Sequence, residues 1–172
     1  DHWTRHRSTM SDEVPKRLEG YEVVVTNKVV IDATAMESPA LRLIVVAATG
    51  TNNIDLTAAA RRGITVCNVR DYASAAVSQH VFSLVLALVT HLGDYTRAVG
   101  QGRWQQSKVF CMLDYPIREL AGLTLGIIGY GNLGRRVAQI AQGFQMQVLI
   151  CARPGSEAVP DGRVPLNTLL RT

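Results

Sequence analysis

The sequence predicts a parallel α/β protein, and two observations carry that prediction. Short apolar runs typical of buried strands alternate along the chain with segments of helical periodicity. Strands of parallel sheets are buried on both faces, which is why they read as continuous apolar runs. The second observation is a glycine-rich segment, 129–134, between one such run and a helical pattern. With 172 residues and 47% hydrophobic content, the chain can bury one sizeable core or parts of two.

Three strands and a short helix are predicted in the first part of the chain. The strands span 21–26, 43–47 and 64–69. The helix spans 55–62 and is closed by Gly63, with Asn52 or Asn53 available to cap its start. The second strand leads into a turn of three small residues, Ala48, Thr49 and Gly50. Such a turn offers backbone N–H groups to a carboxylate, although a simple helix cap is the alternative.

A long helix is predicted over 74–92, with Ser74 as its cap, and we expect it to be largely buried while linking two lobes. Apolar residues recur along it at helical spacing: Val77, Val81, Leu84, Val85, Leu88 and Leu92. The segment 93–122 that follows is more polar and irregular. We interpret that segment as an interlobe or subunit contact.

The glycine-rich segment has the G-x-G-x-x-G spacing of a dinucleotide-binding turn. A strand is predicted over 125–128, a helix face follows it, and the next strand spans 147–151, which completes a βαβ unit. The first glycine permits the tight turn, the second lets the backbone approach a pyrophosphate, and the third lets the helix pack on the strand. The predicted cofactor-binding residues here are Gly129, Tyr130, Gly131, Asn132, Leu133 and Gly134.

Composition excludes several other classes of protein. The net charge is +4, but the basic residues are scattered, and the pairs Arg61-Arg62 and Arg135-Arg136 lie on predicted helices as solvated faces, so no nucleic-acid partner is expected. The longest apolar run, 81–89, falls short of a membrane span, so no membrane partner is expected. The three cysteines show no metal or redox spacing, which favours reduced thiols and a cytoplasmic location.

Several motifs follow one another along the chain. They read VVVTNKVVID at 23–32, AATGTNNIDL at 47–56, RGITVCNV at 62–69 and QHVF at 79–82, followed by the glycine turn. Together they resemble the D-isomer-specific 2-hydroxyacid dehydrogenases. The resemblance is to the branch of glycerate dehydrogenases and hydroxypyruvate reductases, and it extends over nearly the whole chain from about residue 22.

That resemblance implies a flavodoxin-like substrate lobe and a Rossmann nucleotide-binding lobe, both incomplete in this chain. Residues 1–73 would form part of the substrate (catalytic) domain, and 74–172 the linking helix with the first part of the NAD(P)-binding domain. The first strand and helix are expected to precede Asp1. The catalytic arginine, acidic residue and histidine are expected beyond Thr172, so the chain is assigned no catalytic residue, and alone it is expected to be inactive.

The resemblance also assigns roles to individual side chains and backbone groups. It places the substrate carboxylate on the backbone amides of the 48–50 turn. It places Val77 near the nicotinamide, with core packing as the alternative, and Trp104 beside the active site or a subunit interface, again with packing as the alternative. His80 does not match the catalytic histidine, and we expect it to make a structural hydrogen bond.

The end of the second strand of the βαβ unit predicts which nicotinamide is bound. NAD-specific units carry an acidic residue about 20 positions after the first glycine, where it binds the ribose 2′-hydroxyl. Here Ala152 occupies that place and Arg153 follows it. A guanidinium there can pair with a 2′-phosphate, so NADP(H) is favoured and NAD(H) is the alternative.

The resemblance thus implies an oxidoreductase that reduces a small 2-oxo acid, of the hydroxypyruvate or glyoxylate type, to the D-2-hydroxy acid. Hydride is expected to pass from the nicotinamide to C2 while the histidine supplies a proton. A homodimer is expected, with 95–116 as its contact. The alternative is a non-catalytic nucleotide-binding module of the corepressor type.

Overall fold

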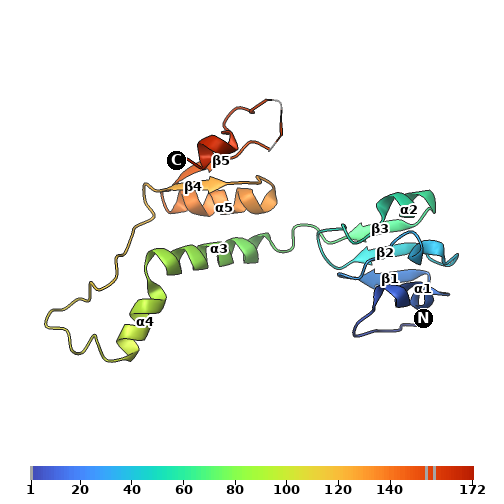
Figure 1. Ribbon diagram of the computed structural model, residues 1–172, viewed down its shortest axis with the longest axis horizontal. Coiled ribbons are helices and arrows are strands. Elements are labelled where there is room, and N and C mark those ends of the chain that lie inside the picture. The colour runs from blue at the N-terminus through green and yellow to red at the C-terminus, as the bar shows by residue number, and fades with distance from the viewer. Residues whose placement is uncertain (1, 154, 157) are drawn as a thin grey trace. The chain divides into compact units, whose positions relative to one another are not determined.

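The computed structural model describes residues 2–153, 155–156 and 158–172. The chain divides into two compact units, Asp1–Tyr72 and Ala73–Thr172, which are described separately below. Figure 1 shows helices and parallel strands in both, so the predicted α/β class is confirmed.

The first unit is built on a three-stranded parallel sheet with the order β1-β2-β3. The strands are β1 (Val23–Thr26), β2 (Leu43–Val46) and β3 (Thr65–Asn68). They align in register, with Val24 opposite Ile44 and Ile44 opposite Val66. All three lie inside the predicted ranges. Their carboxyl ends therefore meet at one edge of the sheet, beside the predicted carboxylate-binding turn.

One face of this sheet holds the core of the unit. Ile44 and Val46 are completely buried there, together with Met36. The other face is open, since Val25 on β1 is 53% exposed and Cys67 on β3 is exposed. The helices of the unit are η1 (Ser11–Glu13), α1 (Val14–Leu18), η2 (Ala35–Glu37) and α2 (Leu56–Arg61).

Helix α2 confirms the predicted helix but not its predicted cap. The N-cap is Asp55, whose carboxylate accepts a hydrogen bond of 2.8 Å from the Ala58 N–H. Asn53 instead donates its side-chain N–H to the Val29 carbonyl at 2.9 Å, which commits it to joining two loops. Gly63 follows the helix at φ +68°, a left-handed angle that suits glycine.

The second unit contains a two-stranded parallel sheet and four helices within its described residues. They are α3 (Ser74–Val89), α4 (Leu92–Gly100), β4 (Thr124–Ile127), α5 (Asn132–Gly143), β5 (Gln147–Ile150) and α6 (Leu166–Leu169). Helices α3 and α5 pack together around Phe82 and Ala141, and the Phe82 ring stacks on Phe144 at 5.4 Å between centroids. A Cβ on Gly126 of β4 would lie 2.8 Å from Leu169, so the missing side chain makes room for α6.

Helix α3 differs from its prediction in length, cap and burial. It ends at Val89, and its N-cap is Ala73, with Ser74 as the first helical residue. Only Ser78 and Phe82 are fully buried, while Leu84 and Leu88 are 52% and 75% exposed. The expected largely buried helix is therefore wrong for this chain, because α5 covers only the face that carries Phe82.

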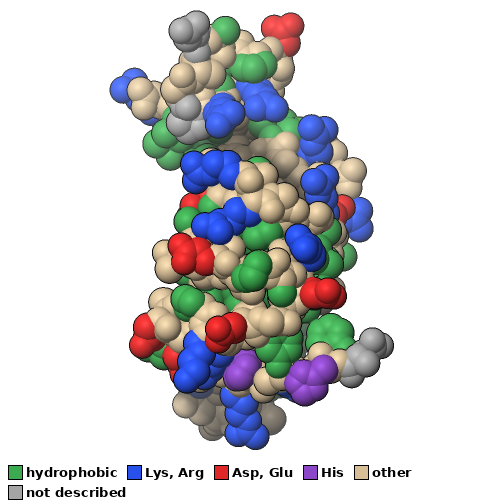
Figure 2. All heavy atoms as spheres, turned by 90° about the vertical axis from the view of Figure 1, so that its right-hand side faces the viewer, with side chains coloured by type: hydrophobic (Ala, Val, Ile, Leu, Met, Phe, Trp, Pro, Cys, Tyr) green, Lys and Arg blue, Asp and Glu red, His purple; other side chains and the backbone are tan. Residues whose placement is uncertain are grey.

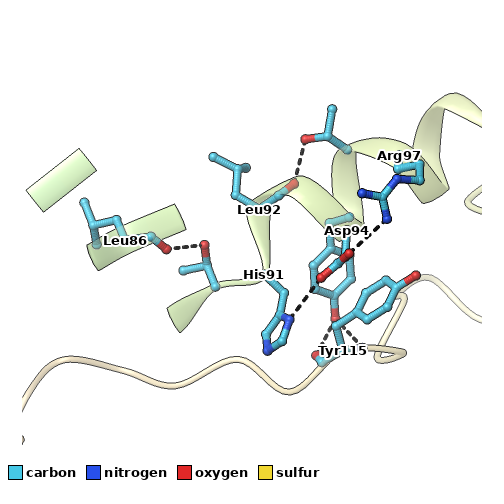
Figure 3. A network of polar contacts seen from close by, with 9 residues as sticks. Leu86, His91, Leu92, Asp94, Arg97 and Tyr115 are labelled. Carbon is cyan, nitrogen blue, oxygen red and sulfur yellow. Dashed lines mark hydrogen bonds and ion pairs between the residues drawn. The ribbon is translucent and has the colours of Figure 1, made fainter. Parts of the chain in front are cut away.

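A short polar network joins α3 to α4, a helix that the sequence interpretation missed (Figure 3). His91 adopts left-handed angles, φ 51° and ψ 37°, and α4 begins at the next residue. Its Nδ1 lies 3.2 Å from an Asp94 carboxylate oxygen, and Arg97 donates to the other oxygen at 3.0 Å. The two helices meet at 61°. The 93–122 segment is thus irregular only after Gly100.

On the face in Figure 2, lysine and arginine side chains are interspersed with apolar and acidic ones. In the part of the chain that the structure describes, no single helix is long and apolar enough to cross a membrane, although the bent α3–α4 pair passes a test of length and composition alone. The thiols of Cys67, Cys111 and Cys151 are free.

Candidate functional site: a glycine turn and a carboxylate-binding turn

The first and third glycines of the turn between β4 and α5 are required by the protein itself. Gly129 has φ +95°, an angle that side chains with a Cβ rarely adopt. A Cβ on Gly134 would lie 2.1 Å from the Gly129 carbonyl oxygen, far inside van der Waals contact. These two residues bring the start of α5 against the end of β4, which is the geometry of a dinucleotide-binding turn.

Gly131 is different, because neither its backbone nor its packing requires glycine. Its angles, φ −82° and ψ −160°, are extended and open to any residue. A Cβ there would meet no protein atom within 4 Å. In dinucleotide-binding units, the backbone at this position approaches the pyrophosphate. Open space at Gly131, between one glycine required by its backbone angle and one required by packing, fits that ligand.

The start of α5 presents hydrogen-bond donors and positive charge. Gly131 is the N-cap and supplies no side-chain cap, and the first turn contains no acidic residue. The first N–H groups of a helix lack intrahelical partners and attract anions. The guanidinium of Arg135 lies over the Tyr130 ring, 5.3 Å from its centroid. This end of the helix therefore suits a phosphate group.

Arg153 lies at the same edge of the sheet as the glycine turn. Ile127 of β4 is paired with Ile150 of β5, so both strands lead into this edge together. Ala152, in the place of the acidic residue, is buried and donates its N–H to the Val164 carbonyl at 2.8 Å. The Arg153 side chain is exposed. This edge therefore carries the positive charge of Arg153. The position of the acidic residue is occupied by Ala152, which has no carboxylate.

In the first unit, the 48–50 turn leaves two backbone donors available. The carbonyls are used: Val69 N–H donates to Ala48 at 3.1 Å, and the Asn68 amide donates to Thr49 at 2.7 Å. Thr49 and Gly50 are exposed, and their N–H groups donate no hydrogen bond within the described residues. The alternative of a simple helix cap is wrong here, because α2 begins only at Leu56 and is capped by Asp55.

Hydrogen bonds between two loops hold the chain that follows this turn. The Ile31 N–H donates to the Asn53 carbonyl at 2.9 Å, and the Asp55 N–H donates to the Ile31 carbonyl at 3.1 Å. Ile31 and Ile54 form an isolated parallel bridge and are both buried. The loops after β1 and β2 are thereby joined, which restricts the position of the donors at Thr49 and Gly50.

The remaining predicted residues, Val77, Trp104 and His80, are exposed. Val77 on α3 is 39% exposed and lies outside the core cluster of its unit, so the core-packing alternative is not met by the contacts described. Trp104 is 51% exposed. His80 is exposed, and the expected structural hydrogen bond is absent from its described contacts. Among the described residues, no group of His, Cys, Asp and Glu side chains is arranged to hold a metal.

Two features of these turns were missed from the sequence. The pair Arg135-Arg136 is exposed, as expected of a solvated helix face, but Arg135 also lies over the Tyr130 ring, a contact that was not predicted. Arg135 directly follows the third glycine and lies in the first turn of α5. This position in the sequence could have indicated that its side chain lies at the glycine turn. The hydrogen bond from Asn68 to Thr49 had no such signal, because it joins residues on different strands.

Comparison with known proteins agrees with this geometry. Residues 2–158 match the model of the family described as D-isomer specific 2-hydroxyacid dehydrogenase, catalytic domain. The chain is 45% identical over 161 residues to a glycerate dehydrogenase of Methylorubrum extorquens, covering 92% of this chain and 50% of that protein. It is 37% identical over 170 residues to a putative 2-hydroxyacid dehydrogenase of Haemophilus influenzae, covering 98% and 54%.

Solved structures give the same result. The TT0316 protein of Thermus thermophilus superimposes with a TM-score of 0.76 at 29% identity, covering 96% of this chain and 53% of that one. A D-lactate dehydrogenase of Aquifex aeolicus, solved with NAD and lactic acid, gives 0.69 at 28% identity, covering 91% and 47%. The chain spans about half the length of the curated relatives that it matches. By its motifs, fold and family match, the chain belongs to the D-isomer-specific 2-hydroxyacid dehydrogenases.

Proposed function

We propose that the protein reduces a small 2-oxo acid, of the hydroxypyruvate or glyoxylate type, to its D-2-hydroxy acid with NAD(P)H. The observation that carries the proposal is the free space beside the Gly131 backbone. Neither the backbone angles nor the packing at this position requires a glycine. Relatives named glycerate dehydrogenase, hydroxypyruvate reductase and glyoxylate reductase support the substrate class. No feature of the described residues favours the corepressor-type alternative.

In this proposal the described residues of the chain bind and orient the cofactor and the substrate. The N–H groups at the start of α5 bind the cofactor diphosphate, and those of Thr49 and Gly50 bind the substrate carboxylate. Bound nicotinamide supplies the hydride.

The direct test is cofactor oxidation by the full-length protein. We expect loss of NADPH or NADH absorbance on adding hydroxypyruvate or glyoxylate, and a product of D configuration on chiral chromatography. Full-length protein that binds the cofactor but oxidises it with neither acid would contradict the substrate class. Protein that binds neither cofactor would contradict the proposed function altogether.

The preference for NADP(H) rests on Arg153 and on the absence of an acidic residue at Ala152. A guanidinium binds a phosphate dianion through several donors, and a carboxylate in its place would repel the same group. We expect a lower Michaelis constant for NADPH than for NADH, and we expect Arg153→Ala to raise the NADPH value by about tenfold while leaving NADH nearly unchanged. Equal Michaelis constants in the unaltered protein would remove the preference.

A homodimer is proposed through the 95–116 segment. Three of its apolar side chains are exposed in this chain, namely Val109 at 64%, Phe110 at 93% and Leu113 at 84%. Several exposed apolar side chains in one short segment favour a protein partner. Light scattering on the full-length protein tests the proposal, and a monomer at micromolar concentration would contradict it.

A further inference from the structure

Arg135 is exposed, and its side chain lies at the glycine turn in contact with Tyr130. Its backbone N–H donates to the Gly131 carbonyl at 2.9 Å, which places it in the first turn of α5. Its guanidinium carbon lies 5.3 Å from the centroid of the Tyr130 ring, a residue between the first two glycines. Tyr130 is half-buried, so the ring offers a steady surface for the cation.

The neighbouring arginine on the same helix behaves differently. Arg136 donates a hydrogen bond to the Gln139 side chain at 3.2 Å, one helical turn along α5. By contrast, no ion pair of the described residues includes Arg135, so its charge is not neutralised there by a carboxylate. A contact of the guanidinium carbon with a ring occupies none of the N–H donors in an ion pair, so they are available to a phosphate.

We infer that Arg135, held over Tyr130, binds the diphosphate of the cofactor beside the glycine turn and is a general affinity residue rather than a selector between the two cofactors. This inference rests on the proposed dinucleotide site. The diphosphate is common to NADH and NADPH, whereas the 2′-phosphate belongs near the end of β5, at Arg153. Arg135 therefore acts equally on both cofactors, and Arg153 acts on NADPH alone.

Tyr130 is a positioning residue in this arrangement. Its ring restricts the guanidinium before any ligand binds, which lowers the conformational entropy that binding would otherwise cost. Tyr130→Phe keeps the ring and removes only the hydroxyl. Tyr130→Leu removes the ring and leaves Arg135 unrestrained, so it weakens binding without removing a charge.

Equilibrium binding of NADPH and of NADH to the full-length protein, followed by nicotinamide fluorescence in the absence of substrate, tests the inference. We expect Arg135→Met to raise both dissociation constants by the same factor, about tenfold, through loss of one charge-assisted contact. Arg136→Met is the matched control and should change each constant less than about twofold. Tyr130→Leu should raise both by about threefold, with Tyr130→Phe close to the unaltered protein.

Each result has a distinct meaning. The salt dependence of both dissociation constants should weaken in Arg135→Met, since an ionic contact is lost, but not in Tyr130→Phe. Unchanged affinities in Arg135→Met, or a loss confined to NADPH, would overturn the role of Arg135 and leave the dinucleotide site intact. Failure of the unaltered protein to bind either cofactor would instead overturn the proposed function. Circular dichroism verifies the fold, and Arg135→Gln provides a second neutral variant.

Discussion

Single residues of the glycine turn are required for different reasons, and the difference is measurable. Gly134 is required because a Cβ would collide with the Gly129 carbonyl, whereas Gly131 has free space around it. We expect Gly134→Ala to lower the free energy of unfolding by about 1–3 kcal/mol through overpacking. Gly131→Ala should leave stability unchanged or slightly higher but raise the dissociation constants for NADH and NADPH. Chemical denaturation and cofactor titration of both variants would separate the two effects, and equal destabilisation would contradict the distinction.

The carboxylate of Asp94 gives a residue-scale prediction about pH. Hydrogen bonds from His91 and then Arg97 lower the pKa of Asp94 below its ordinary value of 3.8. A carboxyl with a lowered folded pKa stabilises the fold above its unfolded pKa and loses that contribution as the pH falls through the folded value. We expect Asp94→Asn to be slightly less stable than the unaltered protein at neutral pH.

That difference should shrink as the pH falls below 3.8 and should disappear only below the lowered pKa of folded Asp94, where its carboxyl is protonated in the folded protein too. Thermal unfolding followed by circular dichroism at both pH values measures it, and Asp161→Asn is the control at an exposed carboxylate. A difference that persists in acid would show that Asp94 acts through packing rather than through its charge.

Much of the candidate site was predictable at the residue scale, and the exceptions have physical causes. The spacing of the three glycines predicts the turn because Gly129 and Gly134 meet local steric demands, while Gly131 leaves space for a ligand. The cap of α2 was not predicted, since Asp55, Asn52 and Asn53 are all suitable cap residues by type. Which of them caps depends on the bridge between Ile31 and Ile54, a contact between distant loops that local sequence does not contain.

At the scale of elements, the cap of α2 can be tested directly. Asp55 accepts a hydrogen bond from the Ala58 N–H at 2.8 Å. We expect Asp55→Ala to cost about 1 kcal/mol of stability, and Asp55→Asn, which keeps a side-chain oxygen, to cost less. Urea denaturation of the full-length protein measures both variants. Equal losses for alanine and asparagine would show that the hydrogen bond contributes little.

Strands were predicted better than helices in this chain. A buried parallel strand is a short apolar run bounded by polar residues, so the five strands were found to within about two residues. The long helix was harder, because its apolar stripe includes both the face against α5 and the exposed Leu84 and Leu88. Periodicity reports that a helix is amphipathic, but it does not report which neighbour covers it. Helix α4 was missed because Gly93 and the polar residues of Leu92–Gly100 weaken its helical pattern.

For the whole molecule, the proposed dimer makes a prediction about assembly. Phe110 is 93% exposed within the 95–116 segment. We expect Phe110→Asp to shift the full-length protein from dimer toward monomer, because a charge would be buried at the contact. Trp3→Ser, at another exposed aromatic side chain, is the control and should leave the dimer intact. Analytical ultracentrifugation distinguishes these outcomes, and an unaltered dimer in Phe110→Asp would place the contact elsewhere.

The close approach of Gly126 and Leu169 has a consequence for how this protein and its relatives can diverge. Gly126 has no side chain, and the Leu169 side chain fills the space that a larger residue at 126 would need. Enlarging residue 126 alone would force the Leu169 side chain to shift, and shrinking residue 169 alone would leave space beside β4. The two positions are therefore expected to exchange volume together, so that an alanine at 126 is accompanied by a shorter side chain at 169 in sequences that keep this packing.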